Sequence, residues 1–569
     1  MQWDRTSLLS SVGSANPVNF TTPGGAKSAD IVVHDTQVYQ SIYGSGGSLT
    51  DSAALTLNNL KNRNSNNYWN LLRYLFDPTN GANAAGLSYV RVPLGASDFS
   101  AGLYSFDDVN GDTSFTNFNI NRAPSYLFSV LRDIQSVNRY LKVHVVPWSP
   151  PGWMKTTGTM NGGSLKTQYL TPYATYLLKC LQGFKSQGIN LYAISIQNEP
   201  QNSNPTYPTA VFTPAQEAQV GNALRALMNN NGFGGVKLVG YEHNWDTAAA
   251  YPVTLINDAP NAFAGVAFHC YAGNVGQMDS FHNAHPNKEI YFTECAGLVG
   301  SDWWSDIKWY TDNMCVEYLF FRLLATELDP SFIGGVNHNA ATGLMWNIAL
   351  DGNGNPKLPN TNSCGGPGCR AIAQVNSDGS WSVNQEFYAM AHVSKATIPK
   401  DVGGPMGRRI GITVSGSLGW GLVTTAFVTE RVNKADWQRY SLVVLNCAQY
   451  LFARISVVLI KCLQTTIEFR GKQATITFPV GVTTLWWYAA SPSAKDAAGT
   501  EVLDATATEG FNATASEESN ATATEEGTNA VSETILTNET ASVSASGTTR
   551  RREEPFVYKL PHQTFAPAQ

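Results

Sequence analysis

The sequence predicts an α/β protein, a (β/α)8 TIM barrel with an attached antiparallel β-sandwich domain and a disordered C-terminal tail. Three observations support this fold class. Strand-like apolar runs alternate with amphipathic segments through most of the chain, and short β-rich runs separated by turns follow them. After Ala490 the composition shifts to Ala, Thr, Ser, Glu and Asn. We therefore expect an N-terminal segment 1–37 that contributes in part to the sandwich, a barrel 38–395, a sandwich 396–490 and a tail 491–569.

Eight short apolar runs are the expected barrel strands. Runs that lack polar alternation are typical of parallel strands covered on both faces. The segments between them, such as 125–136 and 173–187, carry Leu, Tyr and Phe at three- and four-residue spacing, as amphipathic helices do. The expected strands are 38–43, 87–94, 141–148, 191–197, 236–241, 265–270, 289–293 and 343–348.

After Ala396 the alternation of strand-like and helix-like segments ends, and short β-rich runs follow one another. These runs are separated by Gly, Asn or charged turns, a pattern typical of an antiparallel sandwich packed beside the barrel. We expect its role to be structural. The runs are 410–414, 422–429, 440–445, 465–469, 475–478 and 483–488.

Composition limits the classes of partner. Only 14% of residues are charged, whereas aromatics make up 11% and there are 14 Trp, a balance suited to stacking on sugar rings. A net charge of −6 without a concentrated basic face argues against nucleic acid or an anionic membrane as partner, and no run reaches the roughly 18 apolar residues of a membrane helix. We expect a monomer that binds a β-linked polysaccharide.

The tail and the cysteines bear on localisation. The segment after Ala490 cannot bury enough apolar area to offset its ordering entropy, and Asn19, Asn512, Asn520 and Asn538 each begin a glycosylation sequon. We therefore expect a secreted, extracellular glycoprotein associated with a cell wall, although the N-terminal residues show no apolar core of signal-peptide length. Cys364 and Cys369 bracket a tight loop that could close a disulfide, and no Cys-x-x-Cys pair indicates a metal site.

Two apolar, Cys-bearing stretches differ from their surroundings. Residues 315–332 and 447–463 lack the turn residues of neighbouring segments, and the second is longer than an ordinary strand. Our hypothesis is that one or both are insertions, such as retained intron sequence.

Two carboxylates follow expected strands at the barrel's carboxyl rim. Glu199 follows run 191–197 and Glu294 ends run 289–293, 294 − 199 = 95 residues later. Either residue alone would more often be a surface side chain or a helix cap. The rim as a whole, however, carries polar and aromatic residues suited to sugar recognition and acid/base chemistry. They are Arg91, Asp98, Trp148, Asn198, Glu242, His243, Asn244, His269, Tyr271, Trp346 and Asn347.

Such a pair is the minimum apparatus for glycoside hydrolysis without a metal or cofactor. One carboxyl group protonates the leaving oxygen while the other attacks or activates water, and proximity of like charges separates their pKa values. Asn198 could bind the sugar 2-hydroxyl, and Tyr271 or His269 could orient Glu294. A carboxyl separation of about 5–5.5 Å would mean retention of configuration and about 6.5–9.5 Å inversion.

Six motifs resemble those of glycoside hydrolase family 30, in order along 39–488. They are RVPLGASDFS, PWSPPGWMK, IQNEP, FHCYAG, YFTEC and MWNIAL. The resemblance implies a retaining hydrolase whose barrel carries a side β-sandwich, with Glu199 as acid/base and Glu294 as nucleophile. It implies substrate binding by Arg91, Asp98, Trp148, Asn198, His269, Tyr271 and Trp346. The stretches GYEHNWD and LPNTNSCGGPGC are similar to the fungal endo-β-1,6-glucanases of the family.

Other activities use the same residues. A β-1,6-galactanase or a glucosylceramidase of this family would keep both carboxylates and differ in its rim contacts. A non-catalytic carbohydrate-binding wall glycoprotein would keep the barrel without turnover, and the intact glutamate pair counts against it.

Overall fold

The computed structural model describes residues 18–24, 28–303, 332–361, 363–364, 368–415, 421–447 and 462–492, with Gln2–Trp3, Glu317–Tyr318, Gln449–Phe452, Val457–Ile460, Ile307, Thr311 and Leu418. The tail beyond Pro492, three of the four sequons, most of the candidate insertion 315–332 and part of the candidate insertion 447–463 lie outside the described residues. The remaining sequon residue, Asn19, is exposed.

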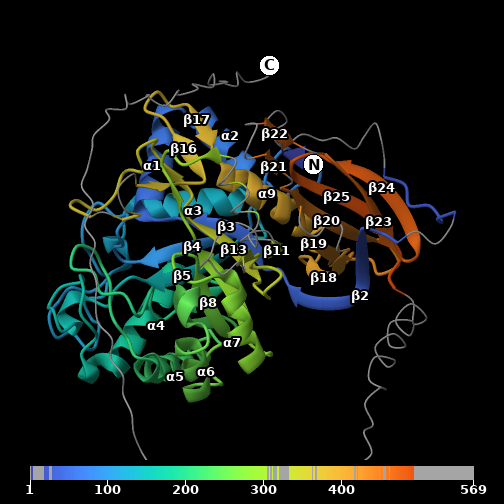
Figure 1. Ribbon diagram of the computed structural model, residues 1–569. Helices are drawn as coiled ribbons and strands as arrows, with labels where there is room; N and C mark the ends of the chain where they lie inside the picture. Colours follow the sequence, from blue (N-terminus) through green and yellow to red (C-terminus); the bar gives the residue numbers. More distant parts are fainter. Residues whose placement is uncertain are drawn as a thin grey trace, which may run out of the picture. The chain divides into compact units, whose positions relative to one another are not determined.

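Eight parallel strands form the barrel (Figure 1). Seven neighbouring pairs are hydrogen-bonded in register, and β9 meets β13 through the Ala341 N–H, which donates to the Ile290 carbonyl at 2.8 Å. The ring of strands is therefore nearly closed. In order around it, the strands are β13 (Thr342–Asn347), β3 (Gly44–Ser48), β4 (Tyr89–Leu94), β5 (Lys142–Pro147), β6 (Ala193–Ser195), β7 (Lys237–Asn244), β8 (Gly265–His269) and β9 (Glu289–Glu294).

The first barrel strand corrects an expectation. Residues 38–43 belong mainly to β2 (Ile31–Ser41), which pairs with strands of another sheet, and the barrel begins at β3 with the sequence GSGGS. A Cβ at Gly46 would lie 1.7 Å from the Tyr89 carbonyl oxygen. Glycine is thus required by close backbone approach, which hides this strand from any apolar pattern.

Helices cover the outside of the barrel strands (Figure 1). Their starts follow local capping rules; for example, Thr213 and Gln216 form a reciprocal capping box with Pro214 at the first position of α5. The helices are α1 (Asp51–Arg63), α2 (Ser65–Phe76), α3 (Ser125–Val137), α4 (Leu170–Ser186), α5 (Pro214–Asn230), α6 (Tyr251–Asp258), α7 (Met278–Ala284) and α9 (Gln385–Thr397). Single 3-10 turns are η1 (Ile120–Arg122), η2 (Gly152–Met154), η3 (Thr167–Tyr169), η4 (Trp245–Thr247) and η5 (Val275–Gln277).

Tyrosines fill the amino-terminal half of the barrel. The ring of Tyr192 lies edge-on to the rings of Tyr43 and Tyr89, with centroids 5.7 and 5.8 Å away, and Tyr291 lies 5.9 Å from Tyr43. The barrel interior is therefore packed at this end, which leaves the carboxyl ends of the strands for chemistry.

All six runs expected after Ala396 are strands, and they join one hydrogen-bonded sheet of eight. Figure 1 shows β2, from the start of the chain, beside β18, and β2 also pairs in parallel with β23. In order, the sheet contains β1 (Gln2–Trp3), β25 (Gly481–Ala489), β20 (Gln438–Asn446), β19 (Leu422–Thr429), β18 (Arg408–Val414), β2, β23 (Leu463–Phe469) and β24 (Lys472–Phe478).

This eight-stranded sheet has two buried faces. Ring centroids of Tyr440 on β20 and Phe469 on β23 lie 4.8 Å apart although three strands separate them in the sheet, so its two halves share a core. Alternate residues such as Val443 and Phe427 point the other way and join the core of the barrel. Helix α9 packs between the barrel and the sheet, and His392 Nδ1 on this helix lies 2.7 Å from Thr484 Oγ1 on β25.

Five further small strand pairs complete the described secondary structure. The strands are β10 (Gly297–Leu298) with β15 (Cys369–Arg370), β14 (Ala349–Leu350) with β16 (Ala373–Val375), β16 with β17 (Trp381–Val383), β11 (Glu317–Tyr318) with β12 (Phe332–Ile333) and β21 (Gln449–Phe452) with β22 (Val457–Ile460). Within the described part of the chain, no helix is long and apolar enough to cross a bilayer.

Candidate active site

The carboxyl ends of the barrel strands bring Glu199 and Glu294 face to face. Glu294 is the last residue of β9, His269 is the last residue of β8, and Glu199 follows β6. The backbone N–H of Glu199 donates to the Glu242 carbonyl at 2.9 Å, which ties this loop to β7. All three side chains therefore start from rigid strand ends.

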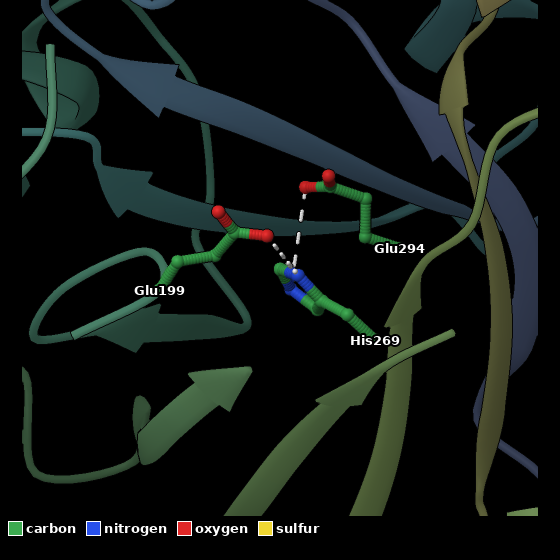
Figure 2. A group of neighbouring side chains, drawn as sticks. All are labelled: Glu199, His269 and Glu294. Atoms are coloured by element: carbon green, nitrogen blue, oxygen red, sulfur yellow. Dashed lines mark hydrogen bonds and ion pairs between the residues drawn. The ribbon is translucent and has the colours of Figure 1, made fainter. Parts of the chain in front are cut away.

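Figure 2 shows Glu199, His269 and Glu294 pointing toward one another. One ligand atom from each side chain lies within 4.8 Å of the other two. His269 Nδ1 is 3.1 Å from Glu199 Oε1, and His269 Nε2 is 4.0 Å from Glu294 Oε2. The imidazole thus links the two carboxylates.

Glu294 is held by two donors, one on each oxygen. Arg91 Nη1 donates to Oε2 at 2.6 Å, and the Tyr271 hydroxyl donates to Oε1 at 3.0 Å. Arg91 is fully buried and Glu294 is only 5% exposed, so this charge-assisted bond is shielded from water. The carboxylate has little freedom to rotate.

Glu199 lies in a strained conformation. Its φ is 49°, in the left-handed region, which costs a non-glycine residue about 1–3 kcal/mol. Besides the contact with His269, its Oε2 accepts from Asn202 Nδ2 at 2.8 Å. The strain directs the side chain toward the centre of the rim.

A third carboxylate, that of Glu242, contacts the same arginine and imidazole; it was expected at the rim but was assigned no catalytic or binding role. It is fully buried, and its Oε2 accepts from Arg91 Nη2 at 3.0 Å and from Thr293 Oγ1 at 2.7 Å. His269 Nε2 is 3.3 Å from the same oxygen. The sequence signal was its position after an apolar strand, which it shares with Glu199 and Glu294.

The aromatic residues form one wall of the site. The rings of Trp148 and Trp346 are stacked at 4.8 Å with an interplanar angle of 23°, and the Arg91 guanidinium lies 4.8 Å from the Trp148 centroid. Arg91 also donates from Nη2 to Asn198 Oδ1 at 2.6 Å. One cation therefore joins the aromatic wall, the amide and two of the carboxylates.

Asp98 lies at the edge of the same cluster. The Ser363 hydroxyl donates to its Oδ2, while its buried Oδ1 has no hydrogen-bond partner among the described residues. Burial raises the pKa of Asp98 to about 7, against the opposing effect of the Ser363 hydroxyl. An unsatisfied acceptor here is suited to a sugar hydroxyl.

The protonation of the cluster follows from its contacts. Burial disfavours the charged form of His269, yet Glu294 and the hydrogen bonds to Glu199 and Glu242 raise its pKa to about 9. Burial likewise opposes ionisation of Glu199, but the hydrogen bond from His269 lowers its pKa to about 2. Burial raises the pKa of Glu294, against His269 and Arg91. These contacts therefore favour a proton on His269 over one on Glu199.

Two further features bear on the site. Cys270 and Cys295, next to His269 and Glu294, form a disulfide with a Cα–Cα distance of 5.3 Å that joins the ends of β8 and β9. The expected disulfide between Cys364 and Cys369 is confirmed.

Glu199, His269 and Glu294 are also the group of described residues whose donor atoms are close enough to hold a cation. Arg91 and the protonated imidazole already place positive charge there. The set is thus suited to acid/base chemistry through its own protons.

The structure brings together all nine residues expected at the site. Glu199 and Glu294 face each other, Arg91, Asn198, His269 and Tyr271 contact them or each other, and Trp148 and Trp346 form the wall beside Arg91. Two facing carboxylates at the carboxyl rim of a parallel barrel, with stacked tryptophans, define a glycosidase type of site.

The chain belongs to glycosyl hydrolase family 30, whose TIM-barrel domain matches residues 42–397, and it is a glycoside hydrolase. The endo-1,6-beta-D-glucanase of Neurospora crassa is 32% identical over 395 residues, which cover 67% of this chain and 75% of that protein. Endo-1,6-beta-D-glucanase neg1 of Aspergillus fumigatus is 30% identical over 401 residues, with 66% and 75% covered. The solved structure of an endo-beta1,6-glucanase shares the fold, with a TM-score of 0.66, 24% identity and coverage of 83% and 96%.

Proposed function

We propose that this hydrolase is a retaining endo-glycosidase that cleaves β-1,6-glucosidic linkages in fungal-type, pustulan-like β-1,6-glucan. The observation that carries the mechanism is the close approach of Glu199 and Glu294, whose nearest oxygens lie within 4.8 Å of each other. Retaining glycosidases hold their two carboxyl groups about 5–5.5 Å apart, whereas inverting enzymes need room for a water molecule. The activity of the fungal relatives supports the choice of substrate.

The reaction is a double displacement. Glu294 attacks the anomeric carbon while the departing O6 takes a proton from Glu199, which leaves a glycosyl-enzyme ester. Glu199, now a carboxylate, then removes a proton from water as the water attacks the same carbon and releases Glu294. Arg91 and Tyr271 stabilise the carboxylate of Glu294 each time it leaves.

Substrate contacts are assigned to the remaining residues. Asn198 is next to the acid/base and binds the 2-hydroxyl, an interaction that strengthens in the oxocarbenium-like transition state. Asp98 accepts from another hydroxyl through its unpaired Oδ1. Trp148 and Trp346 provide the aromatic surface for a sugar ring.

The setting of the enzyme is part of the proposal. Two disulfides favour an oxidising compartment, so the chain works outside the cell as a secreted glycoprotein at a fungal-type wall. It acts as a monomer on a polysaccharide, and a net charge of −6 without a concentrated basic face disfavours a nucleic acid or an anionic membrane as partner. The two halves of the eight-stranded sheet form the side β-sandwich, in which β1 and β2 join the strands of 396–490, and the barrel begins at β3.

The test is a side-by-side assay of pustulan, a β-1,6-galactan and glucosylceramide. We expect rapid loss of pustulan chain length with early release of gentio-oligosaccharides, and proton NMR of the first product is expected to show the β-anomer. Preferential cleavage of the galactan or the lipid would replace the substrate assignment, and an initial α-anomer would exclude retention. Binding of glucan without cleavage would mean a carbohydrate-binding protein instead.

A further inference from the structure

Glu242 lies in a part of β7 that departs from regular strand geometry. Residues 240 and 243 pair with 266 and 268 of β8, so β7 carries an extra residue, a β-bulge. Tyr241 and Glu242, the two residues inside the bulge, have φ values of 70° and 48°, in the left-handed region. Bulges next to active sites re-aim side chains, and this one places a carboxylate inside the barrel.

The guanidinium and the two hydroxyl groups that contact the Glu242 carboxylate are all donors. Oε1 accepts from the Ser195 hydroxyl at 2.6 Å, and Oε2 accepts from Arg91 and Thr293. Behind Ser195, His144 Nε2 lies 2.7 Å from the hydroxyl oxygen, and burial lowers the pKa of His144 to about 4, so its ring is neutral. Only an ionised carboxylate satisfies this set of donors.

The same argument determines the protons of His269. Nε2 faces Glu242 at 3.3 Å, and Nδ1 faces Glu199 at 3.1 Å. A neutral imidazole has one N–H, so it would turn a lone pair toward one of the two carboxylates. The contacts of His269 with Glu199 and with Glu242 are therefore both favourable only when a proton lies between the two atoms of each contact. That proton sits either on the ring nitrogen or on the carboxylate oxygen.

We propose that Glu242 is a positioning residue that keeps a proton on His269 Nε2, so that the proton between His269 Nδ1 and Glu199 is the one delivered to the leaving oxygen. In the first displacement this proton moves from Nδ1 through Glu199 to O6, and His269 becomes the neutral Nε2–H tautomer. In the second, Glu199 takes a proton from water and returns it to Nδ1. One proton is lost and one regained in each cycle.

Glu242 has a second effect, through Arg91. The two terminal nitrogens of the guanidinium are divided between carboxylates, with Nη2 on Glu242 and Nη1 on Glu294. This arrangement directs Nη1 to the nucleophile. The inference rests on the proposed function for the roles of Glu199 and Glu294, but the protonation of His269 is independent of any substrate.

The charge around His269 comes from several elements. These groups are Arg91 on β4, Glu199 after β6, Glu242 and His243 on β7, Tyr271 after β8 and Glu294 on β9. Of these groups, Glu242 is the one within hydrogen-bond distance of Nε2, and it has no proposed role in bond making or breaking. Its charge is therefore the one that can be removed without removing a proposed reacting group.

The test compares Glu242→Gln, Glu242→Asp and the control Glu217→Gln. Glu217 is equally buried and accepts from the Tyr241 N–H at 2.9 Å and the Tyr251 hydroxyl at 2.9 Å, without contact to Arg91 or His269. Glu242→Gln can keep its oxygen toward Arg91 and His269 with Nε2 toward Ser195, so it removes charge with little change of shape. Glu242→Asp keeps the charge and moves it.

We expect kcat of Glu242→Gln on pustulan to fall about 10²-fold at pH 8, with KM little changed, and to recover in part as the pH is lowered. Its alkaline limb shifts down by about three pH units, because an anionic partner of His269 is lost. Glu242→Asp is expected to have a lower kcat with the alkaline limb of the wild type. Glu217→Gln is expected to have both the kcat and the alkaline limb of the wild type.

A second readout uses 15N-histidine NMR of the folded proteins, with the His269 signals assigned through His269→Asn. Wild type and Glu217→Gln are expected to show both ring nitrogens protonated at pH 7, and Glu242→Gln only one. A doubly protonated His269 in folded Glu242→Gln, or an equal loss of activity in Glu217→Gln, would overturn the inference. Wild-type protein that fails to cleave pustulan while showing the expected His269 signals would count against the proposed function alone.

Discussion

At the scale of single residues, the site contains more carboxylates than cationic donors, so neighbouring carboxylates share the same N–H groups. Three carboxylates, Glu199, Glu242 and Glu294, share one arginine and one imidazole within a buried cluster. Low exposure strengthens each of these interactions, so the loss of one partner changes the protonation of the others. Mutations at this scale are expected to alter chemistry more than substrate binding.

The two proposed catalytic carboxylates are distinguished by chemical rescue. Glu294→Ala and Glu199→Ala are each expected to reduce turnover by at least about 10⁴-fold, since each removes a group that takes part in both displacements. With an activated aryl glycoside, azide should rescue Glu294→Ala as the α-glycosyl azide and Glu199→Ala as the β-glycosyl azide. Product NMR checks both, and undiminished activity in either variant would refute the assignment.

Activity is expected to follow a bell-shaped pH profile. The nucleophile must be ionised, so kcat/KM falls below the raised pKa of Glu294. The acid proton depends on His269, whose pKa is raised to about 9, so kcat/KM falls again as the pH rises through that value. A profile measured on pustulan between pH 3 and 10 tests both limbs; full activity at pH 10 would contradict the role of His269.

At the scale of elements, two strands depend on glycine for close backbone approach. A Cβ at Gly46 in β3 would lie 1.7 Å from the Tyr89 carbonyl oxygen, and one at Gly265 in β8 would lie 1.9 Å from the Glu289 carbonyl oxygen. Neither clash can be relieved by a side-chain rotation. These positions therefore define how tightly neighbouring strands pack.

Gly46→Ala is expected to destabilise the fold by about 3 kcal/mol or more, because backbone on either side would have to move. Chemical denaturation and soluble yield measure the loss. Gly235→Ala is the matched control, since a Cβ there meets nothing within 4 Å. Equal stability of the two variants would show that β3 can shift away from β4.

The Cys270–Cys295 disulfide joins the strands that end in His269 and Glu294. Closing a loop of 25 residues contributes about 3.5 kcal/mol in the chain-entropy account. The double substitution Cys270→Ser and Cys295→Ser should lower stability by that amount and reduce kcat, because Tyr271 and Glu294 lose a shared anchor. Thermal unfolding and pustulan kinetics check this; Cys462→Ser, at an exposed cysteine, is the control.

At the scale of the whole molecule, the barrel and the eight-stranded sheet share one core. Twelve of the thirteen residues of α9 are buried, and Val423, Phe427 and Val443 of the sheet belong to the same cluster as the barrel residues. The Arg439 guanidinium donates to the Ile398 carbonyl, which closes the end of α9. The sheet therefore covers barrel surface that would otherwise be apolar and exposed.

A chain limited to residues 42–397 is expected to be insoluble or to lack cooperative unfolding, because it would expose α9 and the barrel side chains beneath the sheet. The 1–492 chain should unfold in one transition. Calorimetry of both tests this, and a soluble, cooperative 42–397 fragment would show that the barrel is stable by itself.

Elements could be predicted from the sequence where residues next to one another in the chain determine the structure. Strands β4, β5, β7, β8, β9 and β13 were predicted within a few residues because each is an apolar run. Strand β3 was not, since its Gly and Ser residues are selected by the neighbouring backbone. Helix α9 was not, because a helix buried on all sides lacks an amphipathic pattern.

The sequence by itself determined the alternation of barrel elements, the β-rich character of the second region and the positions of Glu199 and Glu294 at strand ends. These depend on residue type and short spacing. The contribution of the N-terminal segment to the second sheet was also expected. Only the tertiary structure decided that residues 38–41 continue this strand instead of starting the barrel, that Cys270 pairs with Cys295 and that Glu242 contacts Arg91 and His269. The physical reason is that each of these depends on contacts between residues far apart in the chain, brought together only when the barrel closes.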